Sequence, residues 1–307
     1  MLSLILAQKI LSMFVIMAMG FALVRTHVVS SEDSRGVSLA TLYVISPCMI
    51  VSAFQMEMTH EVASGFVLAL GAGLLVQVLF WLLSVVFGRL LKLDAVERAS
   101  VIYSNAGNLI VPLVVMTLGQ DMVIYCTAYL AFQTIFMWSH GKSLMEGKRS
   151  VSWRKMFLRI NMVAVYVGLF MFFAGLRFPE PVAIAVDSVG SMVGPAAMLV
   201  TGMIMGSIDF RAMLSYRRLS IPVVLRLVVF PLIALAALKF TPLATLAPNG
   251  ASVLLVTLLA AAAPSASTIN QMAQIYNHDA GYASAINVVT ILLCIVTMPT
   301  MVALYQL

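Results

Sequence analysis

Charged residues are scarce in this sequence. Only 10% of its 307 residues are Asp, Glu, Lys or Arg, whereas ordinary soluble domains carry about a quarter. This scarcity, together with 62% hydrophobic residues and a mean hydropathy of +1.04, excludes a typical soluble domain. The net charge of +6 does not predict nucleic-acid binding, because most basic residues lie in short segments between apolar runs.

Cysteine is also rare. The three cysteines, Cys48, Cys126 and Cys294, all lie inside apolar runs, so neither a disulfide framework nor a metal site is indicated. The four histidines show no metal-ligand spacing. We find no nucleophile–base arrangement and no Gly-rich phosphate motif. The sequence therefore predicts a protein that is not an enzyme and needs no cofactor.

Long apolar runs dominate the chain instead. We count ten runs of about 18 residues or more, enough to cross a hydrocarbon core of about 30 Å as helices. Strands of a barrel would alternate in polarity, and these runs do not. The predicted spans are 4–24, 37–55, 62–88, 97–118, 121–138, 157–176, 182–206, 219–240, 251–276 and 281–305.

Lys and Arg are distributed unevenly between these runs. The segments after spans 1, 3, 5 and 7 hold 14 of the 18 basic residues, and the opposite side holds only Arg177 and Lys239. The positive-inside rule then places both termini outside the cytoplasm. The first run lacks a basic n-region, so we interpret it as a span and not a signal peptide. We expect a protein integral to the plasma membrane, the inner membrane in a bacterium.

Four landmarks recur in the second half of the chain at offsets of 148–158 residues. They are FALVR (21–25) with FAGLR (173–177), Pro47 with Pro195, Pro112 with Pro264, and Asp121 with Asp279. Five spans per repeat would insert the second copy upside down, which is typical of secondary transporters. The predicted fold is an all-α membrane protein of two inverted five-helix repeats, 1–156 and 157–307, with a short cytoplasmic segment at 139–156.

Two spans carry helix-breaking and small polar residues at matched positions. SNAGNLIVPLV (104–114) lies in span 4, and AAAPSASTINQ (261–271) lies in span 9. A helix break in the membrane is tolerated only where protein or a watery cavity surrounds it. We therefore expect broken, crossing helices 4 and 9 that form a substrate site. The candidate ligands are Asn105, Asn108, Pro112, Pro264, Ser265, Ser267, Thr268 and Asn270.

A structural interpretation competes with this one. Proline in a membrane helix can be a simple kink, and Asn or Ser can join neighbouring helices. We favour kinks at Pro47 and Pro195, which lack flanking amides. The matched breaks favour a site around Asn105.

Ionisable side chains inside the spans are few. Cation and proton carriers place carboxylates at such crossings, and the two broken motifs contain none. A neutral or anionic solute is therefore favoured, held by amides and by helix N-termini. Asp187 either reaches the membrane interface or takes part in coupling. For Arg226, about seven residues into span 8, we expect a side chain that extends toward the cytoplasmic interface.

Several motifs together resemble the auxin efflux carrier family, in its short bacterial form. VERASVIYSNAGNLIVPL (96–113) keeps the seven-residue spacing of Asn105 and Pro112, and GPAAMLVTGMIMG (194–206) is similar to a P-x-A-M-x-x-x-G element. LRLVVFP (225–231) places Arg226 in a family position, and AAPSAST (262–268) and TILLCIVTMP (290–299) resemble the ends of spans 9 and 10. Thr268 replaces a frequent Asn, so the second amide ligand is either Thr268 or Asn270.

The resemblance implies a transport domain from 62–138 and 219–305 and a scaffold from 4–55 and 157–206 that forms a homodimer. It also implies export or exchange of small organic anions such as auxin-like or malate-like carboxylates, by elevator-type alternating access. A sodium- or proton-coupled symporter and a transporter-fold receptor remain alternatives. A sodium site would need clustered carboxylate and carbonyl oxygens.

Overall fold

The computed structural model describes residues 2–57, 59–147, 160–208, 211, 213 and 215–307. Across these residues the chain forms helices and turns, and its extended pairing is confined to one isolated bridge between Ser104 and Ser265. The prediction of an all-helical membrane protein is confirmed at this level. Residues 157–159, the predicted start of the sixth span, lie outside the described residues.

Among the described residues, seven helical segments are long and apolar enough to cross a membrane, and each lies on one of the predicted runs. They are Ala7–Arg25, Ser34–Ala53, His60–Leu90, Gln120–Glu146, Glu180–Gly206, Ser220–Lys239 and Ala280–Gln306. The other three runs contain the shorter apolar helices Ala106–Leu118, Ile160–Phe173 and Gly250–Ala262. Two of these three runs, spans 4 and 9, are the ones in which the sequence predicts a break.

The described part of the first half ends at residue 147. Its elements are α1 (Leu2–Arg25), α2 (Ser34–Ala40), α3 (Ser46–Ala53), α4 (His60–Leu90), α5 (Ala95–Ile102), the π-helical turn η3 (Ala106–Ile110), α6 (Val111–Leu118), α7 (Val123–Phe136) and α8 (Lys142–Glu146). The helical segment on the fifth predicted span runs to Glu146, so helix continues into the predicted cytoplasmic segment 139–156, of which residues 148–156 lie outside the described residues. Met145, near this helix end, is buried against the core.

The second half shows a similar succession. Its elements are α10 (Ile160–Phe173), α11 (Glu180–Ser191), α12 (Val193–Gly206), α14 (Ser220–Val224), the π-helical turn η6 (Leu225–Val229), α15 (Phe230–Lys239), α16 (Gly250–Ala262), α17 (Ser267–Ile275) and α18 (Ala280–Gln306). Asp279 caps α18, because its carboxylate accepts a hydrogen bond from the Tyr282 amide at 2.8 Å. Its predicted counterpart Asp121 lies in a short 3-10 turn before α7 and makes no such cap.

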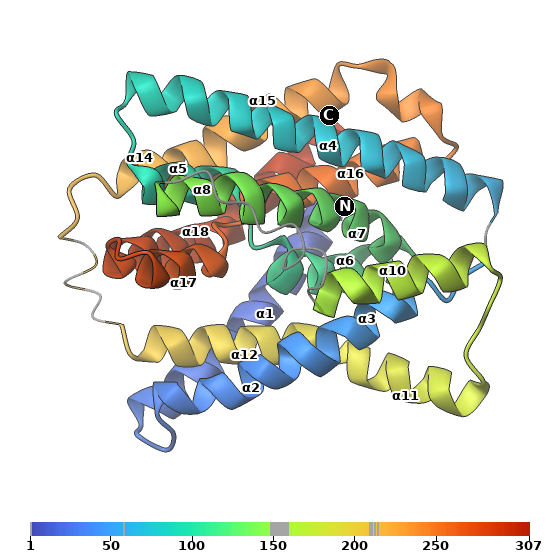
Figure 1. The fold of residues 1–307 in the computed structure, drawn as a ribbon, viewed down its shortest axis with the longest axis horizontal. Helices are drawn as coiled ribbons and strands as arrows, with labels where there is room; N and C mark the ends of the chain where they lie inside the picture. Colours follow the sequence, from blue (N-terminus) through green and yellow to red (C-terminus); the bar gives the residue numbers. More distant parts are fainter. Residues whose placement is uncertain (1, 58, 148–159, 209–210, 212, 214) are drawn as a thin grey trace.

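The helices form two groups that pack mainly among themselves. α1 packs along α12, and α3 contacts α10 and α11, whereas α4 contacts α7 and α16 and α17 packs on α18. Figure 1 shows α4 and α15 along one edge of the molecule and α2, α3, α11 and α12 along the other, with α5, α7 and α16 between them.

α1 and α12 approach each other unusually closely. A Cβ atom added at Gly202 would lie 1.9 Å from the Met17 carbonyl oxygen, and one added at Gly20 would lie 2.2 Å from the Leu199 carbonyl oxygen. Such small residues let membrane helices pack backbone to backbone, where van der Waals contact replaces the hydrophobic driving force. The backbones of α1 and α12 are therefore in direct contact at these glycines.

Candidate functional site

Two interrupted helices meet in the interior of the molecule. α5 ends at Ile102 and α16 ends at Ala262, and both chains then become extended for a few residues. The Asn105 amide donates to the Pro264 carbonyl at 2.8 Å, and the Ala266 amide donates to the Tyr103 carbonyl at 2.9 Å. The bridge thus replaces helical hydrogen bonds that each interruption gives up.

The cause of the interruption is plain in the second half. Pro264 has no amide hydrogen, and its ring disfavours helical geometry at the residue before it. Ala263 accordingly adopts φ −61° and ψ 154°. In the first half the break falls at Tyr103–Asn105, where Tyr103 has φ −95° and ψ 125°. No proline lies there.

Pro112 therefore does not cause the first interruption, and its predicted place in a substrate site stays a prediction. Proline fits the first turn of a helix, where an amide donor is not needed, and Pro112 occupies that place in α6. It is buried, and a Cβ added at Gly194 of α12 would lie 2.8 Å from its Cβ atom. Pro112 thus packs against a neighbouring helix, and the break precedes it by seven residues or more.

Side chains from the last long helix of each half satisfy the extended backbone. The Gln133 amide on α7 accepts from the Ser104 amide at 3.0 Å and donates to the Ser104 carbonyl at 2.8 Å. On α18, Asn287 donates to the Ser265 carbonyl at 2.6 Å, and Thr290 accepts from the Ser265 amide at 3.1 Å. Our sequence interpretation missed these three residues, although a buried polar side chain in an apolar helix is itself a signal.

The Arg226 side chain binds the two helix ends that precede the bridge between Ser104 and Ser265. Its guanidinium donates to the carbonyls of Ala263 at 2.8 Å and Ala261 at 2.7 Å. It also donates to the carbonyls at positions 101 and 102, at 3.0 and 3.3 Å. These are the free carbonyls at the C-terminal ends of α16 and α5, where a helix leaves acceptors without partners.

The expectation that Arg226 extends toward the membrane surface is wrong, because the residue is 0% exposed. Counting residues from the end of a span gives the depth of a side chain in the membrane. It does not reveal that the ends of two other helices lie beside that side chain.

The N-terminal ends of the following helices begin on the opposite side of the bridge. Asn105 precedes η3 and is 5% exposed, and within the described chain its side-chain amide has no hydrogen-bond partner. Ser265 is 1% exposed, and its hydroxyl also lacks a protein partner among the described residues. Buried polar groups normally have partners, so the Ser265 hydroxyl marks a place where a water or a solute can bind.

The other predicted ligands are distributed over the helices that follow. Ser267 and Thr268 form the first turn of α17 and are half-buried, and Asn108 is exposed on η3. The carbonyl oxygen of the Asn270 side chain is buried and unpartnered among the described residues. The structure therefore brings Asn105, Pro264 and Ser265 into direct contact and places the remainder one or two turns away.

A cavity of about 450 Å³ opens beside α17. Asn270, Gln274 and Ser284 line it together with Ile208, Met213 and Tyr216 from the segment after α12. Asn270 thus lies both on the helix that follows the second interruption and in the lining of this cavity.

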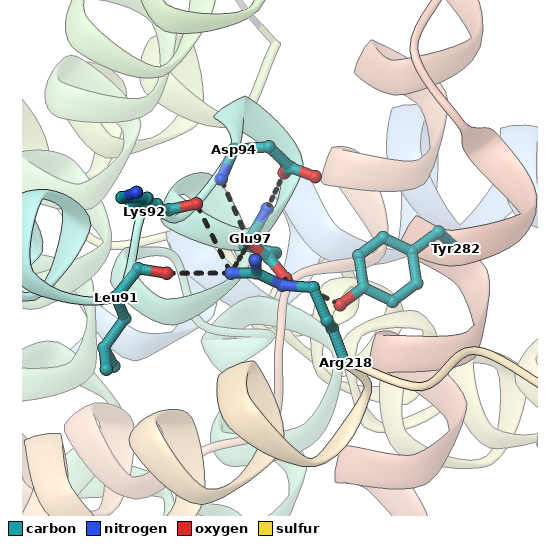
Figure 2. Close-up of polar contacts among 6 residues, drawn as sticks. All are labelled: Leu91, Lys92, Asp94, Glu97, Arg218 and Tyr282. Atoms are coloured by element: carbon teal, nitrogen blue, oxygen red, sulfur yellow. Dashed lines mark hydrogen bonds and ion pairs between the residues drawn. The ribbon is translucent and has the colours of Figure 1, made fainter.

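Glu97 is a buried carboxylate that our sequence interpretation passed over. It is 1% exposed and forms an ion pair with Arg218 at 3.2 Å, and it accepts a hydrogen bond from the Tyr282 hydroxyl at 2.8 Å. Asp94 and Glu97 also form a capping box at the start of α5. Figure 2 shows Arg218 directed at Glu97 and at the Leu91 and Lys92 carbonyls, to which it donates at 2.9 and 3.3 Å.

Asp187 lies on α11 and is exposed. Its carboxylate accepts a hydrogen bond from the Ser52 hydroxyl on α3, which in turn accepts one from Gln120 at 3.1 Å. These contacts link α11 and α3 to the turn before α7. Both predicted roles of Asp187, at the interface or in coupling, stay predictions. Among the described residues no group of three or more His, Cys, Asp or Glu could hold a metal ion.

The long apolar helices are those of a polytopic membrane protein, and the family comparison adds that it is a transporter. A model of the membrane transport protein family matches the chain twice, over residues 5–151 and 148–302. The chain belongs to this family, that of the auxin efflux carriers, whose members are transporters. No curated protein matches the chain.

Proposed function

We propose that this protein is a secondary carrier of small organic anions, in particular carboxylates, which it exports or exchanges. The anion binds at the bridged interruption, between Asn105, Ser265 and the start of α17. Asn108, Ser267, Thr268 and Asn270 line its path. Membership of a transporter family supports the general function.

The observation that carries the proposal is the polarity of the four helix ends at the bridge. The helices that begin at Ala106 and Ser267 both direct their N-terminal ends at it, and each such end acts as about half a positive charge. Unpartnered groups of Asn105 and Ser265 lie at the same place. No acidic residue lies in 103–110 or 263–271, so the site favours an anion over a cation.

We further propose that the chain forms two inverted five-helix repeats, with helices 4 and 9 crossing at the bridge. Two family matches that meet near residue 150 support the repeat. Residues 62–138 and 219–305 form a transport domain that moves like an elevator against a dimerising scaffold of residues 4–55 and 157–206. The separate packing of α1 with α12 and of α4 with α7 and α16 supports this division.

The direction of opening follows from the same proposal. The cavity lined by Asn270 lies at the end of the molecule that the charge distribution assigns to the cytoplasm. At the other end, Gln120 of the transport domain is tied through Ser52 to Asp187 of the scaffold. The conformation is therefore inward-open, with its outer side closed.

Transport by purified protein in proteoliposomes tests the proposal. A panel of labelled mono- and dicarboxylates is offered with and without imposed pH and sodium gradients. We expect flux of at least one carboxylate without either gradient. Asn105→Ala should weaken it by about 10- to 100-fold, because a lost polar contact to a bound solute costs about 1–3 kcal/mol.

Gln8→Ala is the matched control, because it removes an exposed amide near the start of α1. It should leave the flux unchanged. Flux that requires a sodium or pH gradient would favour the coupled symporter, and binding without flux would favour a receptor. If Asn105→Ala transports every carboxylate as the parent does, the interruption is not the binding site.

A further inference from the structure

Arg226 is a buried positive charge without a buried negative partner. Its guanidinium binds four backbone carbonyls and lies 5.6 Å from the centre of the Phe80 ring. Within the described chain no carboxylate forms an ion pair with it. Glu97, the buried carboxylate of α5, is already paired with Arg218.

This arrangement resembles a cation site in which the cation is part of the protein. In transporters with interrupted helices, the free carbonyls and C-terminal ends of half-helices coordinate coupling ions such as sodium. Here the guanidinium binds the C-terminal ends of both α5 and α16. Because a guanidinium stays protonated under all physiological conditions, this positive charge cannot leave.

The position of Arg226 couples it to the proposed anion site. It binds the Ala263 carbonyl, and the next carbonyl, of Pro264, binds the Asn105 amide. The guanidinium and the Asn105 backbone amide therefore bind neighbouring carbonyls of the same bridged segment. Burying an uncompensated charge is costly in a medium of low dielectric constant, so a single negative charge across the bridge is strongly favoured.

We infer that Arg226 is the fixed counter-charge of the transported anion and replaces a coupling cation, so that a monocarboxylate moves as part of an electrically neutral complex. This inference rests on the proposed function. The empty site keeps one positive charge, a bound monoanion cancels it, and a bound dianion leaves one negative charge. Arg226 holds both interrupted helices, so it accompanies the anion whichever elements move.

The inference predicts a different voltage dependence for each transport mode. In exchange of a monoanion for itself, both half-cycles carry the neutral complex, and an imposed potential should not change the rate. In net flux the empty site must return with its positive charge, so the potential should change the rate. Dianion exchange should also respond. A full charge that crossed the whole field would give at most about 50-fold per 100 mV.

The experiment uses the full-length protein in proteoliposomes with a potassium–valinomycin potential at equal pH and without sodium. Self-exchange of a labelled monocarboxylate and of a labelled dicarboxylate is measured at zero and at negative potential. We expect the monocarboxylate rate to stay constant and the dicarboxylate rate to change severalfold. If only one of the two carboxylates is transported, the voltage dependence of its self-exchange alone tests the inference. A voltage-sensitive monocarboxylate exchange, or a voltage-insensitive dicarboxylate exchange, overturns the inference.

Substitution of the arginine reverses the expectation. In Arg226→Gln the monocarboxylate complex carries a net negative charge, so its exchange becomes voltage-sensitive, whereas Arg226→Lys keeps the parental behaviour. Arg226→Gln leaves carbonyls unpaired and can fail to fold, in which case the parental protein alone decides the question. Absence of carboxylate flux in every mode overturns the proposed function itself, and flux with the wrong voltage dependence overturns only the role of Arg226.

Discussion

Glu97 and Arg218 form an ion pair in which one partner is buried and the other is half exposed. Arg218 also binds the Leu91 and Lys92 carbonyls after α4, and Tyr282 of α18 binds the same carboxylate. The side chains of Glu97 and Arg218 thereby join four parts of the proposed transport domain. Such a network favours movement of these elements as one body.

Removal of Arg218 should leave the Glu97 carboxylate buried without its positive partner. Arg218→Ala is expected to destabilise the protein by about 1–2 kcal/mol, less than the about 3–5 kcal/mol of a fully buried pair, because Arg218 is half exposed. Thermal unfolding in detergent measures the loss. Adding Glu97→Gln in the same chain should recover part of it, and two strictly additive losses would contradict the coupling.

Arg226, Glu97 and Gln133 show why single residues of the site were hard to predict. The partners of Arg226 lie 35–37 and 124–125 positions away, and those of Glu97 include residues 121 and 185 positions away. No local pattern reports such contacts. The position of Asn105 and Ser265 at the interruptions was predictable, because polar residues and broken backbone are costly in an apolar span unless protein or water surrounds them.

At the scale of helices, one break was located by its chemistry and the other was not. Pro264 forces Ala263 out of helical geometry, so the sequence indicates the second interruption to within a residue. Pro112 was misleading, because proline is equally compatible with the first turn of a new helix. The first break depends on pairing of Ser104 with Ser265 and with Gln133, which is a property of the folded molecule.

The contact of α1 with α12 makes a prediction for the elements. Gly202→Ala places a Cβ atom 1.9 Å from a backbone oxygen, so the two helices must move apart. We expect a loss at the upper end of the about 1–3 kcal/mol that over-packing costs, measured by thermal unfolding. Gly71→Ala on α4 is the control, since a Cβ atom there meets nothing within 4 Å. Equal stability of both variants would show that the contact is not rigid.

At the scale of the whole molecule, the charge distribution predicts the orientation in the membrane. With Cys48, Cys126 and Cys294 replaced, Arg217→Cys should react only with permeant thiol reagents. Leu307→Cys, which is 91% exposed, should react from outside the cell. Labelling of intact cells followed by gel shift measures both. Reaction of both cysteines from the same side would contradict the even number of spans and the inverted repeat.

The bridge between Ser104 and Ser265 also imposes an order on biosynthesis. A ribosome releases residues 101–105 long before Arg226, Pro264 and Ala266, the groups that bind their backbone. Unsatisfied peptide groups in lipid cost several kcal/mol each, so the fourth helix cannot hold its interrupted form when it first enters the bilayer. It inserts as a provisional segment and reaches its final shape only when the second half arrives. The nascent first half is consequently a client for membrane chaperones, and its lifetime is the time needed to translate about 160 further residues, roughly ten to thirty seconds.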